Sequence, residues 1–301
     1  MPGDLAEVLE RLGLRPRTVT VMKDVPAENA SWLIESRDGE RLALRRYHAR
    51  ATYADLSYEH AVLRHLAQTG WVVPETAGPL IRHGGLWYCP TRFVPGQAVA
   101  AETAFQRRRR GRDLADLHIA LRGLGERIGQ RPDWQAQHTD VTVHTSLDWQ
   151  ACLSALTEAS PRLGAWADAA ATRTREALAR VGADDLPLIV VHGDFAEWNV
   201  HYQRGRLAGV IDFGLTHLDS RPYELAIART YRSPEAVDAY RAWLANHGWP
   251  LTELEEAAIV PVYRAFRVDM AAWSMEQGRI TGDYDLAMIE RQLSRTGTPQ
   301  P

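Results

Sequence analysis

Apolar and polar residues alternate through much of the first third of the chain, which is the pattern of half-buried β-strands. Three strands are predicted over residues 18–22, 30–36 and 42–47, and two more over residues 79–82 and 86–94. Arg37-Asp38-Gly39 separates the second strand from the third and is typical of a hairpin turn. The first three segments therefore predict an antiparallel meander.

A helix is predicted over residues 53–68, between the third and fourth strands. Thr52 and Asp55 have the spacing of a capping box at the start of this helix. One face of the helix collects three leucines, Leu56, Leu63 and Leu66. Glu59 falls on the same face, so we do not expect it to be an ordinary exposed helix acid.

Helical spacing replaces the strand pattern from about residue 101 onward. Long helices are predicted over residues 114–128, 147–156 and 163–181, and further helices begin near residues 222, 234, 251 and 284. Two short strands, at residues 188–191 and 207–211, interrupt this region. Strands followed by helices are typical of an α+β protein with segregated parts. We therefore predict two domains, residues 1–96 and residues 97–301, divided near Pro95-Gly96.

The two late strands each precede a polar loop with candidate chemistry. The first loop contains His192-Gly193-Asp194 and, five residues after Asp194, Asn199; the second contains Ile211-Asp212-Phe213-Gly214. Transfer of a phosphoryl group to a hydroxyl requires a base beside the attacking oxygen and oxygen ligands for magnesium. Asp194 is the candidate catalytic base, and Asn199 and Asp212 are the candidate metal ligands. A role as simple turn formers would account for each loop alone, but the two together in this order are a more specific signal.

His-x-Asp-x4-Asn followed closely by Ile-Asp-Phe-Gly resembles the aminoglycoside phosphotransferase and choline kinase-like family, whose members are relatives of the protein kinases. The resemblance covers nearly the whole chain. It implies a two-lobed protein-kinase-like fold, with a small antiparallel-sheet N-lobe for nucleotide binding and a larger, mostly helical C-lobe for catalysis and acceptor binding. It also implies ATP or GTP as the phosphoryl donor and Mg²⁺ as the cofactor. His192 resembles the histidine that supports the catalytic loop.

The same resemblance assigns residues to the phosphates of the nucleotide. Arg45 matches the basic residue of the third strand that holds the phosphates, and Glu59 is its expected partner on the following helix. The period of two in a strand places Ala43 on the same face as Arg45, where a small residue leaves room for the adenine. The family usually has a lysine at this position, so Lys23, the only lysine of the chain, stays an alternative contact to the phosphates.

Two further segments are assigned to the nucleotide by resemblance. Residues 24–31 take the place of the turn that covers the phosphates, although they contain no glycine. Asn29 and Ser31 are the side chains of this turn that could donate to phosphate. Phe93 and Val94 belong to a segment similar to the hinge that contacts the nucleotide base, where the side chains do not distinguish ATP from GTP.

The residues that bind the acceptor are predicted less clearly than those that bind the nucleotide. In the family the acceptor lies between the catalytic loop and the C-terminal helices, and residues 186–301 carry fifteen acids against eleven arginines, which favours a cationic acceptor. Asp269, Trp273 and Glu276 have helical spacing on one face and are candidate acceptor contacts, with a core-plus-surface role as an equal alternative. Trp198, inside the catalytic loop, is a further candidate that could stack on the acceptor.

The composition narrows the class of protein. With 301 residues and a hydrophobic fraction of 45%, the chain can bury a full core. The net charge of −3 argues against a general nucleic-acid binder, and we interpret the basic run at residues 107–110 with Arg112 as a solvated face or a mobile connection. Cys89 and Cys152 lie in unrelated segments and predict buried thiols, with neither a disulfide framework nor a metal site.

No segment reaches the roughly 18 consecutive apolar residues that a membrane span requires. Residues 1–10 carry acids where a secretion signal would have a basic and then an apolar stretch. We therefore expect a cytoplasmic protein with no membrane or nucleic-acid partner. Its oligomeric state is left open by the sequence.

The predicted function is a Mg²⁺- and nucleoside-triphosphate-dependent O-phosphotransferase for a small hydroxylated acceptor. An aminoglycoside-like or other antibiotic is the first candidate acceptor, which would make the protein a resistance or self-protection kinase. Homoserine, an amino alcohol or a thiosugar are the metabolic alternatives, because the family hosts all of these and a fold does not choose among them. A nucleotide-binding pseudokinase is a further alternative; Arg45 and the missing glycines favour it slightly, and Asp194, Asn199 and Asp212 oppose it more strongly.

Overall fold

The computed structural model describes residues 3–23, 29–99, 101–230 and 233–300. The chain divides into two compact units, the first made of residues up to 100 together with 198–213, and the second made of 101–197 together with 214–301. The division at residue 100 lies near the boundary predicted at residue 96. Residues 198–213 belong to the first unit although they follow the start of the second unit in sequence. A prediction with one boundary cannot describe this arrangement.

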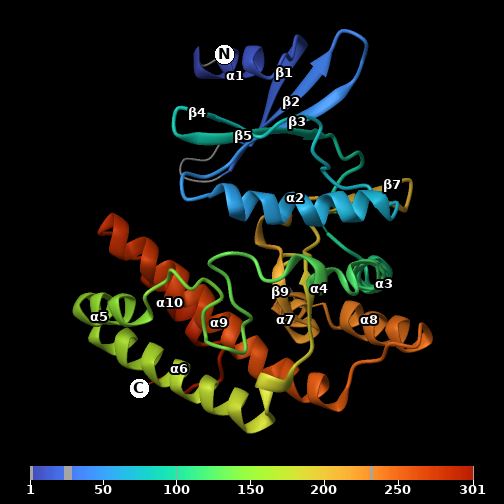
Figure 1. Ribbon diagram of the computed structural model, residues 1–301. Helices are drawn as coiled ribbons and strands as arrows, with labels where there is room; N and C mark the ends of the chain where they lie inside the picture. The colour runs from blue at the N-terminus through green and yellow to red at the C-terminus, as the bar shows by residue number, and fades with distance from the viewer. Residues whose placement is uncertain (1–2, 24–28, 100, 231–232, 301) are drawn as a thin grey trace. The chain divides into compact units, whose positions relative to one another are not determined.

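The first unit contains a five-stranded antiparallel sheet (Figure 1). Its strands lie in the order β1-β2-β3-β5-β4, with the bounds β1 Pro16–Lys23, β2 Ala30–Ser36, β3 Arg41–Arg46, β4 Ile81–His83 and β5 Leu86–Arg92. One face of the sheet packs against α1 (Gly3–Arg11), which contributes Leu5, Val8 and Leu9 to a shared core. The predicted meander of the first three strands is confirmed.

Helix α2 (Tyr53–Gln68) follows β3 in the first unit, as predicted. Its N-terminus is capped by Thr52, whose Oγ1 accepts a hydrogen bond from the Asp55 backbone N–H at 3.1 Å. The predicted apolar face is buried, and it includes Glu59, which is only 1% exposed. The sequence pattern therefore placed this carboxylate correctly inside the protein.

A hairpin of β7 (Val200–Gln203) and β8 (Arg206–Val210) belongs to the first unit because backbone hydrogen bonds connect it there. The Val210 N–H donates to the Val72 carbonyl at 3.0 Å, and Gln97 and Tyr202 exchange N–H···O bonds of 2.9 and 3.1 Å. Gly96, at a φ of +84°, permits this approach, since a Cβ there would overlap the Tyr202 backbone.

The described part of the second unit is mostly helical (Figure 1). Its α-helices are α3 Ala104–Leu121, α4 Leu124–Ile128, α5 Trp149–Ala159, α6 Pro161–Val181, α7 Arg221–Thr230, α8 Pro234–Asn246, α9 Glu253–Thr281 and α10 Leu286–Leu293. Short strands β6 (Leu188–Val191) and β9 (His217–Ser220) pair antiparallel, and one-turn 3₁₀ helices lie at η1 (Ala183–Asp185) and η2 (Phe213–Leu215), the latter at the junction of the two units. The expected helix over residues 114–128 is divided into α3 and α4 at Gly123, which has a φ of +73°. The α+β class is confirmed.

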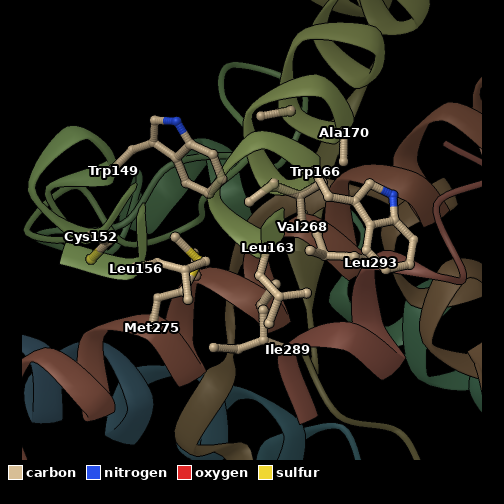
Figure 2. Packing of buried hydrophobic residues seen from close by; sticks show 14 of the residues in the cluster. Trp149, Cys152, Leu156, Leu163, Trp166, Ala170, Val268, Met275, Ile289 and Leu293 are labelled. Carbon is tan, nitrogen blue, oxygen red and sulfur yellow. The ribbon is translucent and has the colours of Figure 1, made fainter. Parts of the chain in front are cut away.

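The main core of the second unit lies where α5, α6, α9 and α10 meet (Figure 2). Trp149 and Leu156 of α5 pack with Trp166 of α6, and α9 and α10 close the cluster with Met275 and Ile289. The small residues of α6 and α9 let the helices approach closely, namely Ala167, Ala170, Ala171, Ala271 and Ala272. This core fixes α9 against α5, α6 and α10.

Both cysteines are buried free thiols, as predicted. None of the helices in the described ranges has the length and apolar character needed to cross a membrane.

The basic run at residues 107–110 lies inside α3, and the expectation that it is a solvated face is wrong for Arg110. Arg110 is 1% exposed, while Arg107 forms an ion pair with Glu235 at 2.9 Å. The partner of Arg107 lies far away in sequence, whereas Arg110 is held both by the nearby Glu102 and by the distant Phe195 and Ser233.

Candidate active site

Arg45 of β3 lies between two carboxylates of the first unit. Its Nη1 donates to Glu59 Oε1 at 3.0 Å, and its Nη2 donates to Asp212 Oδ1 at 3.1 Å. The predicted pair between Arg45 and Glu59 is therefore confirmed. Burial alone would lower the pKa of Arg45, but Glu59 and Asp212 outweigh burial and raise the pKa above its ordinary value. A planar guanidinium can serve both acids at once, which a compact ammonium does less well.

Asn199 and Asp212 come together at the base of the β7–β8 hairpin. The Ile211 N–H donates to the Asn199 carbonyl at 2.9 Å, which holds the residue before Asp212 against Asn199. Asp212 has a φ of +62°, a conformation that is uncommon for a residue other than glycine, and its side chain is 48% exposed. The backbone thus brings a partly exposed carboxylate and a residue with an amide side chain to one end of the hairpin. Oxygen atoms of these two kinds are ligands that Mg²⁺ prefers, so the residues present fit this cation.

Lys23, Ser31 and Arg45 share one face of the sheet. Ser31 pairs with Lys23 on one side and with Arg45 on the other, and directly paired residues of antiparallel strands point to the same face. The structure therefore keeps both basic residues on the face predicted for the nucleotide phosphates. Residues 24–28 of the predicted phosphate-covering turn lie outside the described residues. Asn29, at the end of that turn, accepts a hydrogen bond from the His48 N–H at 2.9 Å through Oδ1.

The predicted hinge residues lie just beyond β5. The Phe93 ring is covered by the Arg41 guanidinium, whose carbon lies 3.9 Å from the ring centroid. Val94 is buried, and a Cβ on Gly209 would contact its side chain. This packing fixes the backbone between the sheet and residue 96, as a hinge for a nucleotide base requires.

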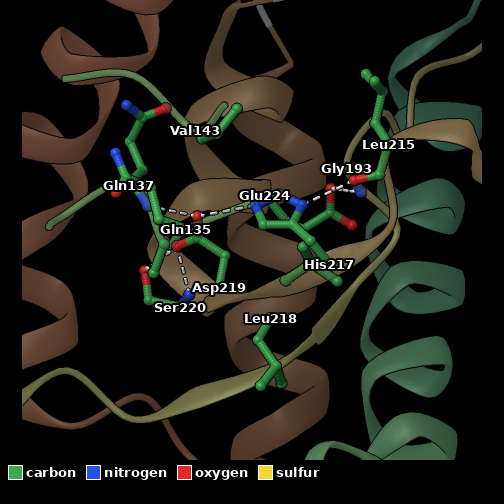
Figure 3. A network of polar contacts seen from close by, with 12 residues as sticks. Gln135, Gln137, Val143, Gly193, Leu215, His217, Leu218, Asp219, Ser220 and Glu224 are labelled. Atoms are coloured by element: carbon green, nitrogen blue, oxygen red, sulfur yellow. Dashed lines mark hydrogen bonds and ion pairs between the residues drawn. The ribbon is translucent and has the colours of Figure 1, made fainter. Parts of the chain in front are cut away.

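The catalytic loop of the second unit begins where β6 ends. Glu224 of α7 accepts hydrogen bonds from the backbone N–H groups of His192 at 3.2 Å and of Gly193 at 3.0 Å (Figure 3). The Asp194 N–H donates to His192 Nδ1 at 3.1 Å, which leaves the ring hydrogen of a neutral His192 on Nε2. His192 is fully buried and thus supports the loop, in line with its predicted role. The backbone that leads into Asp194 is accordingly anchored.

A second loop, residues 214–217, is locked against the catalytic loop. Gly193 has a φ of +88°, and a Cβ at this position would overlap the Leu215 carbonyl (Figure 3). Thr216 Oγ1 donates to the Val191 carbonyl at 2.6 Å, and His217 Nδ1 lies 2.8 Å from the Leu215 carbonyl. Glycine is therefore required at residue 193 both by its backbone conformation and by this close approach.

Glu224 is a buried carboxylate with several partners. Burial would raise its pKa, but His118, His192 and the Gly193 N–H outweigh burial and hold the pKa below its usual range. Burial lowers the pKa of His118, whose Nδ1 lies 2.7 Å from the Tyr240 hydroxyl. With that hydroxyl donating to Nδ1, Nε2 carries the hydrogen and faces Glu224 Oε2 at 3.6 Å. The anchor of the catalytic loop is therefore an ionised carboxylate beside a neutral imidazole.

The loop between α4 and α5 contributes residues that the sequence did not single out. Arg131 is 3% exposed, and its Nη1 donates to the carbonyls of Gly214 and Thr216, both at 2.8 Å. Asp219 accepts from the Gln137 N–H at 2.7 Å and lies 3.2 Å from His217 Nε2 (Figure 3). A polar loop with one arginine has no local signal for such contacts, because they depend on which strand the loop packs against.

The predicted acceptor residues do not share one environment. Trp198, in the first unit, and Trp273, on α9, are 44% and 48% exposed. Asp269 is only 4% exposed and accepts a hydrogen bond from the Val143 N–H at 3.1 Å. Glu276 is paired with Arg279 at 2.7 Å and accepts from Cys152 Sγ at 3.3 Å. For the three residues of α9 this matches the core-plus-surface alternative.

The two units together define the class of protein. A five-stranded antiparallel sheet with a buried Arg–Glu pair, and a helical unit that begins its catalytic loop with His-x-Asp, are the parts of a kinase-like phosphotransferase. Residues 24–258 match the phosphotransferase enzyme family known as APH, and the chain belongs to this family. The predicted family and enzyme class are confirmed.

Sequence relatives include two bacterial homoserine kinases. That of Phenylobacterium zucineum is 28% identical over 77% of this chain and 72% of its own, and that of Caulobacter vibrioides is 26% identical over 89% and 86%. Among solved structures, the amicoumacin kinase hAmiN in complex with AMP-PNP, Ca²⁺ and Ami aligns with a TM-score of 0.68 at 15% identity, covering 97% of this chain and 93% of its own. Aminoglycoside phosphotransferase APH(4)-Ia with ADP and hygromycin B aligns at 0.64 and 16%, covering 98% and 97%. These likenesses confirm the protein-kinase-like fold.

Asp269 generates a prediction about stability and pH. Burial raises its pKa to about 7; the Val143 N–H opposes the shift, while Asp219 and Asp140 add to it. Because the folded pKa lies above the unfolded value of 3.8, the folded chain binds more protons between these pH values, and stability falls as pH rises through that window. Asp269→Asn should therefore gain stability over the wild type from pH 4 to pH 8, by at most roughly 4 kcal/mol.

Urea unfolding of both proteins at several pH values measures this difference. Glu253→Gln, which removes an exposed carboxylate from the same helix, is the matched control and should show no such trend. A difference between wild type and Asp269→Asn that stays constant from pH 4 to pH 8 would show that Asp269 takes up no proton on folding.

Proposed function

We propose that the chain is a Mg²⁺- and nucleoside-triphosphate-dependent kinase that phosphorylates a hydroxyl group of a small, amine-bearing acceptor. The observation that carries the proposal is the arrangement of Arg45, whose guanidinium joins Glu59 to Asp212. In kinase-like enzymes the basic residue of the third strand must be held by the helix glutamate before it can bind phosphates. A pseudokinase needs no such complete set, so the arrangement favours an active enzyme.

Each residue of the set has a distinct role in the proposal. Asp194 orients the acceptor hydroxyl and takes its proton late, since an ordinary aspartate is a weak base. Asn199 and Asp212 would hold Mg²⁺, which neutralises charge on the phosphates when bound. Arg45 contacts the phosphates through its Nη2 edge, with Lys23 as the alternative contact on the same face of the sheet.

The remaining predicted nucleotide residues have supporting roles. Ser31, between Lys23 and Arg45 in the strand register, is placed to donate its hydroxyl to a phosphate. Asn29 already accepts the His48 N–H through Oδ1, so its amide NH₂ is the group that could face the nucleotide. Phe93 and Val94 hold the hinge backbone for the base. ATP is the first donor to test, because the related structures contain ADP or AMP-PNP.

Homoserine is the acceptor with the most support. The two homoserine kinases described above align with 77% and 89% of this chain, which includes both motif loops. At 26–28% identity, however, the acceptor pocket can differ. One neighbour with the same fold is named an amicoumacin kinase, and another is an aminoglycoside phosphotransferase in complex with hygromycin B. Antibiotics with amino and hydroxyl groups are therefore the second class of acceptor, and Trp198 of the catalytic loop is a candidate contact in either case.

The acceptor is identified by incubating the purified protein with ATP or GTP and Mg²⁺ and reading product masses. The panel contains homoserine, other amino alcohols, a thiosugar, aminoglycosides and peptide antibiotics. We expect one class to gain a single phosphate, with homoserine first, because the chain carries both the Arg45–Glu59 pair and the His-x-Asp-x4-Asn motif. Nucleotide binding without a phosphorylated product anywhere in the panel would instead support the pseudokinase.

Asp194→Asn should reduce turnover by at least about 10²-fold while nucleotide affinity stays within about twofold of the wild type, because the residue acts on the hydroxyl and not on the nucleotide. Steady-state rates and nucleotide titrations measure the two quantities separately. Asp185→Asn, at the exposed one-turn helix before β6, is the control for a lost carboxylate. Wild-type turnover in Asp194→Asn would remove the assignment.

Asp212→Ala should abolish the effect of Mg²⁺ on nucleotide affinity. In EDTA, by contrast, the variant should bind nucleotide as well as the wild type or more tightly, because Arg45 loses its competing carboxylate. Titrations of both proteins with and without Mg²⁺ give the four affinities. Glu75→Gln, which breaks the exposed pair with Arg92 in the same unit, should leave all of them unchanged. If Mg²⁺ improves binding equally in Asp212→Ala, the metal is held elsewhere.

A further inference from the structure

Arg110 is a fully buried arginine next to the catalytic loop of the second unit. Its Nε donates to Glu102 Oε1 at 3.0 Å, and its Nη2 donates to Glu102 Oε2 at 2.9 Å and to Ser233 Oγ at 2.8 Å. Burying a guanidinium is costly unless it is paired, and this bidentate contact with a 5% exposed carboxylate supplies the pair. Arg110 is thus held in one orientation by α3, the segment before it and the segment before α8.

The third edge of the guanidinium faces the catalytic loop. Nη1 donates at 3.3 Å to the carbonyl of Phe195, the residue that directly follows Asp194. Nη2 also lies 4.0 Å from Glu197 Oε2, a buried oxygen for which no hydrogen-bond partner is found among the described residues. Arg110 therefore acts on both sides of Ala196, once through a backbone hydrogen bond and once through charge.

The anchors described above act mainly on the part of the loop before the candidate base. Glu224 binds the N–H groups of His192 and Gly193, before the candidate base, and the Ala196 N–H turns back onto the Asp194 carbonyl at 2.8 Å. The Phe195 carbonyl and the Glu197 carboxylate come after the base. Loosening the backbone directly after Asp194 would let its carboxylate move, and a displacement of about 1 Å can cost about 10²-fold in rate.

We propose that Arg110 is a positioning residue for the reaction, which sets the orientation of Asp194 by holding the peptide after it. The proposal rests on the proposed function, in which Asp194 orients the acceptor hydroxyl. It assigns no contact with substrate to Arg110. The arginine acts through the backbone of residue 195 and through the charge of Glu197, and a lysine cannot serve Glu102, Ser233 and Phe195 together because it has a single nitrogen.

The test compares Arg110→Lys with Arg107→Lys. Arg107 lies one turn earlier on α3 and has its own bidentate pair with Glu235, with both contacts at 2.9 Å. Arg110→Lys should lower kcat by roughly 10- to 100-fold with the KM for ATP within about twofold of the wild type. It should also speed hydrogen exchange of the backbone amides of residues 193–198. Arg107→Lys should change neither quantity, whatever it does to the melting temperature.

A folded Arg110→Lys variant with wild-type kcat and wild-type exchange in the loop overturns the proposal, even if its melting temperature falls. So does a parallel loss in kcat and in ATP binding, which would place the effect at the nucleotide. If Arg110→Lys does not fold, Glu102→Gln weakens the hold on the arginine and is judged by the same two outcomes. A wild-type protein that transfers phosphate to no acceptor contradicts the proposed function, while the exchange comparison still decides whether Arg110 orders the loop.

Discussion

A charge removed from water needs a partner of opposite sign, and buried pairs of this kind hold the parts of the site in place. In the second unit, Arg221 at the start of α7 binds Glu255 at the start of α9 at 2.6 Å, with both side chains nearly inaccessible to solvent. That pair fixes the first turn of α7, and Glu224 lies three residues further along the same helix. Anchoring of the catalytic loop therefore begins with an ion pair that does not touch it.

The first unit applies the same rule to the nucleotide side. Arg45 reaches Glu59 on the buried face of α2 from β3, and the second arm of the same guanidinium extends to Asp212. One arginine thus connects the sheet, the helix and the β7–β8 hairpin. This accounts for an arginine at a position where the resemblance to the family predicts a lysine, because a planar fork matches two acids at once.

Features that depend on a single helix or strand could be predicted from the local sequence pattern. Strand alternation, the Thr52 cap and the burial of Glu59 all follow from spacing along a single element, and the structure confirms them. The burial of Arg110 could not be predicted in this way. A run of four arginines has the pattern of a solvated surface, and only the packing of α3 against α8, where Gly111 meets the Ala236 carbonyl, shows which of the four turns inward.

Long-range contacts limited the site prediction as well. Asp269 has the helical spacing of a pocket residue, yet its neighbours come from a loop more than a hundred residues earlier in the chain. The placement of residues 198–213 with the first unit depends on backbone bonds to Val72 and Gln97, for which the sequence contains no pattern. Motifs of consecutive residues identified the candidate base and metal ligands, whereas contacts between distant segments determined their surroundings.

The close fit of Gly193 against the Leu215 carbonyl has a consequence for how such a chain can diverge. The loops at residues 193 and 215 approach closely because glycine has no side chain, so their sequences must change together during evolution. Any residue larger than glycine at position 193 would require a different backbone path for the loop at residue 215. The tip of the β7–β8 hairpin, at Arg204 and Gly205, lies between the two loops in sequence and is exposed. Length variation can accumulate there, so related enzymes can lengthen or shorten this hairpin without disturbing the lock.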